Sequence, residues 1–218
     1  TIEPEGFASE TEALASRRSM LNALGAVVGL ADVFVFTLGL TEGWENSATG
    51  QPYAMCPGTA GGNFDASQHE FVNYRAAAIR VALEQAFTLM RGLNPNLRVL
   101  LTVSPVPLTA TASGQHALVA TSYSKSVLRG VAGELAADID WVDYFPSYEI
   151  ISGAPARGAF FEPNLRSVAP AGVELVMSHF FAGLDLSAPA QHGADTASAD
   201  RATAVRAAVR HEALVCDE

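Results

Sequence analysis

The chain has 218 residues, of which 49% are hydrophobic and 17% are charged. This composition is typical of a globular protein and excludes a disordered, collagen-like or coiled-coil chain. Lys and Arg total 13 against 23 Asp and Glu, a formal net charge of −10. Such an acidic balance disfavours nucleic acid and anionic membranes as partners.

The sequence contains no motif for a bound metal or cofactor. Cys56 and Cys216 lie far apart and form no CxxC pair, so neither a zinc site nor a disulfide framework is expected. No segment has P-loop, dinucleotide-binding or H-E-x-x-H spacing. We therefore expect no metal and no cofactor.

The first residues are acidic and do not resemble a signal peptide, which would need a basic start. The chain also begins without Met and reads as the middle of a longer one, so we expect an N-terminally truncated domain in a cytoplasmic protein. The most apolar stretch, residues 23–40, is interrupted by Asp32 and Thr37. It reads as a helix followed by a strand, and no membrane span is expected.

The first half of the chain predicts two helices and one buried strand. Ser9 and Glu12 form a capping box that opens a helix toward Gly29. Val33–Leu38 is β-branched and aromatic with almost no polar alternation, which predicts a parallel strand covered on both faces. Residues 39–65 are rich in Gly and Pro and are expected to form a long loop. Ser67 and Glu70, a second capping box, predict a helix that runs to about Arg91.

The second half repeats this alternation. Strands are expected at Val99–Val103 and Trp141–Tyr144, with a helix over about 115–137 between them. A turn-rich stretch over 145–170 leads to a last helix at about 171–181. This order predicts an α/β fold with a parallel sheet and helices on both faces, and an active edge at the carboxyl ends of the strands. Residues 1–184 would form the domain, and 185–218 an Ala-rich tail that is helical or disordered.

Unusual polar residues gather in the three loops expected at that edge. Gly39 follows the first strand, where the backbone can turn sharply and leave N–H groups free to bind an oxyanion. Thr41 and Glu42 come directly after it in the sequence. A tight turn capped by Thr41 is the structural alternative. His69 is expected in the first turn of a helix, which favours its neutral, base-competent form, although a surface histidine explains the same pattern.

The other two loops carry weaker signals. Ser104 could be a nucleophile, but it lacks the G-x-S-x-G elbow, and His116 follows the same loop. Lys125 lies on a predicted helix, where a lysine is expected to be a solvated surface charge. Asp143 and Glu149 flank an aromatic turn, and one of them could orient a histidine or simply cap backbone.

Several sequence blocks resemble the GSCFA-domain family. They are TLGLTEGW at 37–44, LLTVSPVPLTAT at 100–111, SKSVLR at 124–129 and VDYFPSYEII at 142–151. PEGF at 4–7, CPGTAGGNFD at 56–65 and NLRSVAPAGV at 164–173 extend the likeness over most of residues 3–182. The family is placed beside the SGNH/GDSL hydrolases and the PC-esterases, so the resemblance implies a flavodoxin-like sheet and, by analogy, ester hydrolysis or acyl transfer through a serine.

The chain departs from the family pattern at the residues that would carry this chemistry. The Gly-Ser-Cys-Phe-Ala block that names the family does not occur in these 218 residues, so we expect the nucleophile upstream of Thr1. Gly39 matches the glycine of the relatives' G-x-N-D oxyanion block, with Thr41 in place of asparagine. Asn164 and Ser167 stand where related hydrolases have Asp-x-x-His, and neither is an acid or base at neutral pH.

Two functions remain open on this sequence. In the first, the chain is an esterase or O-acyltransferase with His69 or His116 as base, Glu149 as its partner and Gly39 and Thr41 at the oxyanion. In the second, it is a catalytically degenerate module that binds a carbohydrate or an acyl group. The residues expected to line the cleft are Glu42, Trp44, Ser104, Tyr148, Asn164 and Arg166. An acylated saccharide is the expected substrate because the loops are aromatic and lack a basic cluster.

Overall fold

The structure of the chain is a computed structural model that describes residues 6–59 and 62–184. The tail predicted at 185–218 lies outside the described residues. The chain divides into two compact units, Thr1–Pro146 and Ser147–Glu218, and each is described by itself. The first unit holds the sheet.

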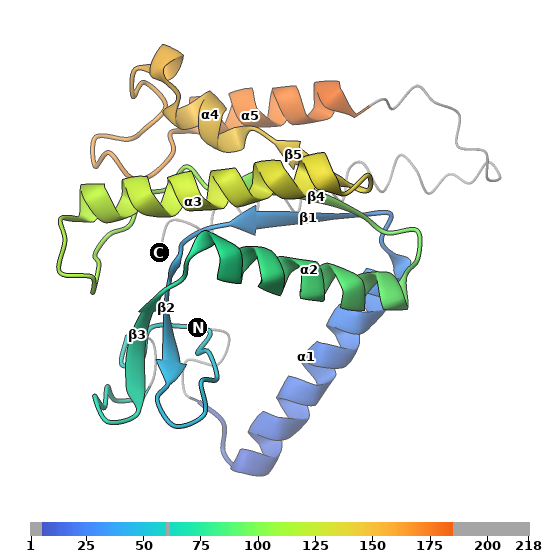
Figure 1. The fold of residues 1–218 in the computed structure, drawn as a ribbon, viewed down its shortest axis with the longest axis vertical. Helices are drawn as coiled ribbons and strands as arrows, with labels where there is room; N and C mark the ends of the chain where they lie inside the picture. The colour runs from blue at the N-terminus through green and yellow to red at the C-terminus, as the bar shows by residue number, and fades with distance from the viewer. Residues whose placement is uncertain (1–5, 60–61, 185–218) are drawn as a thin grey trace. The chain divides into compact units, whose positions relative to one another are not determined.

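Three parallel strands form the centre of the first unit, as the sequence predicted. They are β1 (Val33–Leu38), β4 (Arg98–Val103) and β5 (Val142–Phe145), in the order β1-β4-β5 (Figure 1). Leu38 pairs with Val103 and Thr102 with Phe145, so all three carboxyl ends meet at one edge. Val99, Leu101 and Val103 of the middle strand are 0% exposed, which agrees with its unbroken apolar sequence.

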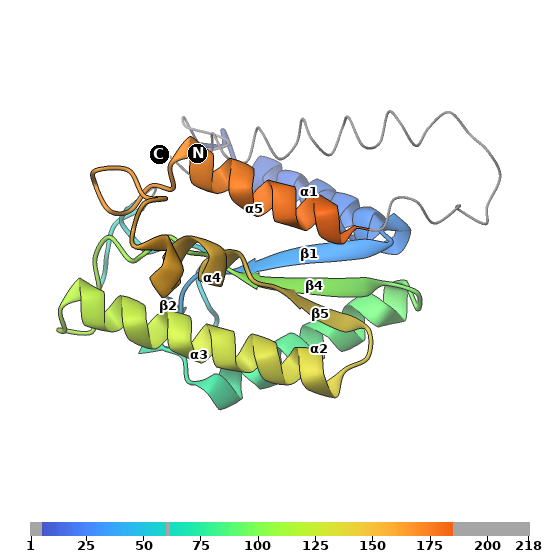
Figure 2. The ribbon, with the colours of Figure 1, turned by 90° about the horizontal axis from the view of Figure 1, so that it is seen from above.

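Helices flank this sheet on both sides. Helices α2 (Ala76–Leu93) and α3 (Ala117–Asp138) lie on one side, and α1 (Glu10–Leu30) lies on the other (Figure 2). Ser9 caps α1 as predicted, with its Oγ accepting from the Glu12 N–H at 3.2 Å. This α/β arrangement is consistent with the expected flavodoxin-like fold.

Residues 42–73 correct the prediction of a long loop followed by a helix from Ser67. They contain an antiparallel pair, β2 (Glu42–Asn46) with β3 (His69–Asn73), and α2 begins only at Ala76. The apparent capping box fails because the N–H and hydroxyl of Ser67 both donate to Asp65 Oδ1, which forms a local turn instead. His69 therefore begins a strand and is not in a helix.

Strand β1 is an edge strand with much apolar surface. Among the described residues, no strand pairs with its side away from β4. Val33, Val35 and Phe36 are 46%, 49% and 39% exposed, which is unusual for a strand of this sequence. The prediction that this strand is covered on both faces is therefore wrong within the described residues.

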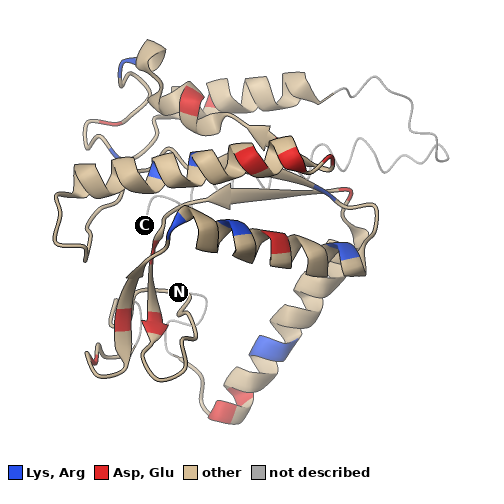
Figure 3. Cartoon of the chain, viewed as in Figure 1, with Lys and Arg blue, Asp and Glu red and all other residues tan. Residues whose placement is uncertain are grey.

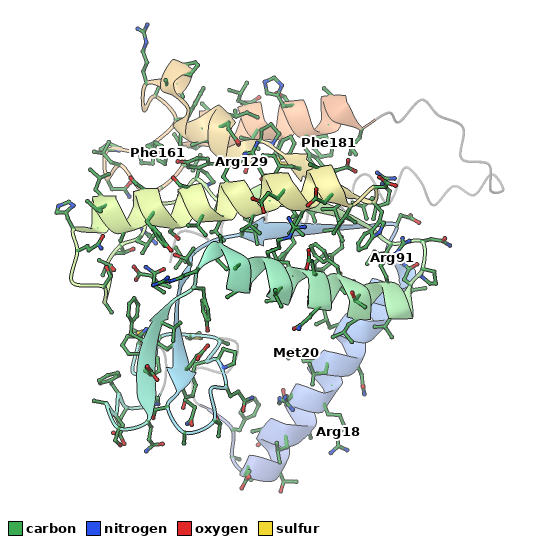
Figure 4. The ribbon with its side chains drawn as sticks, in the orientation of Figure 1. Arg18, Met20, Arg91, Arg129, Phe161 and Phe181 are labelled. Carbon is green, nitrogen blue, oxygen red and sulfur yellow. The ribbon has the colours of Figure 1, made fainter. Side chains whose placement is uncertain are left out.

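Charged and aromatic side chains tie the helices to the sheet. Figure 3 shows acidic residues toward the C-terminal end of α3, beside α2. Arg80 of α2 bonds two of them, Glu134 at 3.2 Å and Asp138 at 2.7 Å. Two further arginines stack on aromatic rings, Arg91 on Trp141 at 4.7 Å and Arg129 on Tyr144 at 4.1 Å. Figure 4 labels both arginines.

The second unit contains α4 (Ser147–Ser152), a 3-10 turn (Ala154–Ala156) and α5 (Pro170–Gly183). Helix α5 confirms the helix predicted at about 171–181, because its two ends differ from the predicted ones by only one or two residues. Gly172 packs closely here, because an added Cβ would lie 2.9 Å from both Phe160 Cβ and Val168 Cγ1. Among the described residues, no helix is both long and apolar enough to span a bilayer.

The Asn94→Ala variant tests how α1 is anchored. Asn94 Nδ2 donates to the carbonyls of Val28 and Ala31 at 3.1 and 2.7 Å, which satisfies the otherwise unpaired end of α1. We expect the free energy of unfolding to fall by about 1–2 kcal/mol, measured by urea denaturation. Asn96→Ala is the control, because the Asn96 side chain makes no hydrogen bond within the described residues. Equal losses in both variants would contradict this role.

Candidate functional site at the carboxyl end of β1

The turn directly after β1 is held by two consecutive residues of α3. Ser124 Oγ accepts from the Thr41 N–H at 2.8 Å, and Lys125 Nζ donates to the Gly39 carbonyl at 2.9 Å. The Thr41 carbonyl in turn accepts from the Tyr74 N–H at 2.8 Å. The backbone over residues 39–41 is therefore fixed on both sides.

Thr41 positions this turn from the inside. Its side chain is 0% exposed, and its hydroxyl donates to Asn73 Oδ1 at 2.7 Å and lies 3.2 Å from Ser124 Oγ. Both donors of Thr41 are thus engaged within the protein. Thr41 therefore positions the turn, and its expected place at the oxyanion stays a prediction.

Gly39 and Leu40 have donors that remain open. Within the described residues, neither of their N–H groups makes a hydrogen bond. Leu40 is 51% exposed, and a Cβ added to Gly39 would meet no atom within 4 Å. The turn therefore has two N–H groups without an acceptor among the described residues, and such donors can bind a negatively charged oxygen.

Lys125 corrects the expectation of a solvated lysine. It is the only lysine in the sequence, and it is 1% exposed. Burial lowers the pKa of its ammonium group to about 8. Among the described residues, no carboxylate forms an ion pair with it, so a buried positive charge lies directly behind the turn.

The helical period of α3 is the signal that could have found this lysine. The buried residues of the helix are Ala120, Ser124, Lys125, Leu128, Val131, Ala132 and Leu135. They recur at spacings of three and four, which places them on one face of the helix. Lys125 is on the apolar stripe and not on the solvated side.

The loop after β4 adds a second polar group at the same edge. The Glu42 carboxylate accepts from the Thr111 hydroxyl at 2.5 Å, and that hydroxyl lies 2.7 Å from Ser113 Oγ. Ser104 is half-buried, and its Oγ accepts from the Val106 N–H at 3.2 Å, so it stabilises the exit of β4. The structure thus brings Gly39, Thr41, Glu42 and Ser104 to the carboxyl ends of β1 and β4.

His116 follows the same loop as the N-cap of α3. It is exposed, and its Nδ1 accepts from the Leu118 N–H at 3.2 Å. A neutral ring in this position carries its proton on Nε2. It must therefore release the Leu118 N–H or turn its ring before Nε2 can accept a proton.

His69 lies at the opposite end of the β2–β3 hairpin from the turn. It pairs with Asn46, whereas Glu42, next to the turn, pairs with Asn73. Its Nδ1 accepts from the Asp65 N–H at 3.0 Å, and its ring lies 5.0 Å from that of Tyr53. Along the two paired strands, His69 lies four residues, or about 13 Å, from the Glu42–Asn73 pair next to the turn. The structure does not bring His69 to Gly39.

Trp44 is engaged in an aromatic cluster on the same hairpin. Its ring packs edge-on against Phe64 at 5.4 Å and Phe71 at 5.6 Å. Both contacts stabilise the hairpin and its following loop. A face of Trp44 stacked on a sugar ring stays a prediction.

The remaining predicted residues belong to the second unit. Tyr148 and Glu149 lie on α4. Asn164 Oδ1 accepts from the N–H groups of Arg166 and Ser167, each at 2.9 Å, so Asn164 forms an Asx turn. Among the described residues, no three His, Cys, Asp or Glu side chains are grouped as metal ligands.

The comparisons with known proteins agree with the sequence blocks that carry the resemblance. The family model described as the GSCFA family matches residues 5–180. No curated protein and no solved structure matches the chain. The match spans both units and includes the turn after β1, the loop after β4 and the SKSVLR block on α3. The chain belongs to the GSCFA family.

Proposed function

We propose that the chain is part of an acyl-ester hydrolase or O-acyltransferase. The observation that carries this proposal is the turn after β1, with two open N–H groups in front and the buried Lys125 ammonium behind. Attack on an ester produces a tetrahedral intermediate with a negatively charged oxygen. Fixed backbone donors at such an oxygen stabilise the transition state, because donors that are already held in place need no reorganisation during the reaction.

The nucleophile in this proposal is a serine outside these 218 residues. The Gly-Ser-Cys-Phe-Ala block is absent from the sequence, and β1 has an unpaired edge with exposed apolar side chains. A further parallel strand paired with β1 would have its carboxyl end beside Gly39, because parallel strands end at one edge. A serine at the end of that strand would face the open N–H groups.

His116 is the better candidate for the general base. It follows the β4 loop whose Thr111 contacts Glu42, one residue past the turn, and it is exposed to solvent. Its bond to the Leu118 N–H is a cap that water can replace. Glu149 as a partner that orients the base stays a prediction.

An acylated saccharide remains the proposed substrate. The loops carry no basic cluster that would suit a phosphorylated group. Contacts of Tyr148, Asn164 and Arg166 with a saccharide stay predictions from the sequence. The cytoplasmic location is likewise a proposal from the sequence alone.

Hydrolysis of 4-nitrophenyl acetate tests the proposed function. We expect the 218-residue chain to be close to inactive and an N-terminally extended protein from the same gene to hydrolyse the ester. Replacing the serine of its Gly-Ser-Cys-Phe-Ala block by Ala should then remove the activity.

Two results would contradict this account. An enzymatic rate from the 218-residue chain would place the nucleophile within it, and Ser104→Ala would then be the first variant to examine. An extended protein that is inert but binds saccharides would favour the binding module.

A further inference from the structure

The Gly39–Leu40 peptide is polarised by a charge that no other part of the described structure neutralises. Lys125 Nζ lies 2.9 Å from the Gly39 carbonyl oxygen and is 1% exposed. A cation bound to a peptide carbonyl draws electron density from the same peptide's nitrogen, which makes its N–H a stronger donor. That N–H belongs to Leu40, and it has no acceptor among the described residues.

The charged side chains on the neighbouring elements that form ion pairs, hydrogen bonds or ring contacts do so with partners other than Lys125. Glu42 bonds Thr111, Glu45 bonds Tyr74, Arg80 bonds Glu84, Glu134 and Asp138, Arg98 bonds Asp143, and Arg129 stacks on Tyr144. Burial is the cause of the lowered pKa of Lys125, with no contribution from a neighbouring charge. The buried Lys125 ammonium therefore has no anionic partner among the described residues, and it lies on the carbonyl side of the peptide whose Leu40 N–H is open. Such a charge lowers the stability of the fold unless an anion binds nearby.

We propose that Lys125 charges the Gly39–Leu40 peptide so that this turn binds a carboxylate, the group released when an acyl ester is hydrolysed. The identity of the ligand rests on the proposed function, whereas the binding itself does not require turnover. Lys125 is a positioning residue in this proposal, because it is too buried to touch the ligand and acts through the peptide.

Acetate is the probe for this site, and the single lysine makes the measurement direct. Protein labelled with 13C-lysine gives one folded lysine signal, whose titration reports the pKa of Lys125. We expect acetate to raise that pKa relative to chloride at equal ionic strength, because a bound anion favours the charged form. The amide signals of Gly39 and Leu40 should shift in the same titration.

Lys125→Met and Arg91→Met distinguish the effect of a charge close to the turn from the effect of the net charge of the protein. Lys125→Met should weaken acetate binding at least about tenfold, because one charge close to the anion is lost. Arg91→Met also removes one positive charge, but Arg91 bonds the Leu97 carbonyl ahead of β4, at the opposite end of the strands. The acetate affinity of Arg91→Met should stay within about twofold of that of the unchanged protein. Glu42→Gln should strengthen binding, because a carboxylate next to the turn repels the anion.

The proposal is overturned if acetate changes neither the Lys125 titration nor the Gly39 and Leu40 signals, or if Lys125→Met binds acetate as well as the unchanged protein. The titration of the unchanged protein decides the matter even if a variant fails to fold. Acetate binding without ester hydrolysis by the extended protein would reject the proposed function alone. Ester hydrolysis by the extended protein, with no effect of acetate on the Lys125 titration or on the Gly39 and Leu40 signals, would reject this inference alone.

Discussion

The Lys125→Met variant is expected to be more stable than the unchanged protein at pH 7. The free energy of unfolding of the unchanged protein should rise between pH 8 and 10.5, and the variant should not show this rise. Burial lowers the pKa of Lys125 from 10.5 to about 8 in the folded state. Between these values the unfolded chain binds more protons than the folded one, so the free energy of unfolding rises with pH. Below pH 8 the full cost of the buried charge is present.

The size of this effect follows from the pKa difference. A shift of this extent corresponds to about 3 kcal/mol, and the bond to the Gly39 carbonyl offsets about 1 kcal/mol of the gain in the variant. We therefore expect Lys125→Met to gain about 2 kcal/mol at pH 7, because methionine fills a similar volume without a charge.

Urea denaturation at pH 7.5, 9 and 10 measures this difference. Burial and the bond to Glu45 raise the pKa of Tyr74 to about 12, which affects stability in the opposite direction at high pH but cancels between the two proteins. Ser126→Lys is the matched control, because position 126 is exposed on the same helix and its lysine should add no such dependence. Parallel curves for the unchanged protein and Lys125→Met would contradict the buried charge.

The second large effect is expected from His116 in the N-terminally extended protein. His116→Ala should lower kcat for an activated acyl ester by about 10,000-fold, the usual consequence of removing a catalytic base. His69→Ala should change kcat by less than about tenfold, because the strand register places His69 away from the turn.

A cap-preserving variant separates catalysis from folding. His116 caps α3 through the Leu118 N–H, so its loss to Ala also weakens the helix start. His116→Asn restores a capping oxygen but cannot act as a base at neutral pH, and it should be as inactive as His116→Ala. A large loss in His69→Ala with full activity in His116→Asn would reverse the assignment.

The parallel sheet could be predicted from the sequence because each strand is marked locally. Val33–Leu38 and Val99–Val103 are rich in β-branched and apolar residues with almost no polar alternation, which is the pattern of parallel strands. The cap of α1 was equally local, since Ser9 and Glu12 interact within one turn. Gly39 at a strand end was found for the same reason.

The hairpin and the role of Lys125 were decided by tertiary contacts. Ser67 and Glu70 have the spacing of a helix start, but residues 69–73 gain more by pairing with residues 42–46, far away in the sequence. Lys125 has the sequence signature of a surface charge, yet its place on the buried face of α3 brings it to the Gly39 carbonyl, 86 residues away. Local sequence fixes which residues can form an element, whereas burial and charge depend on what the folded chain packs against each side chain.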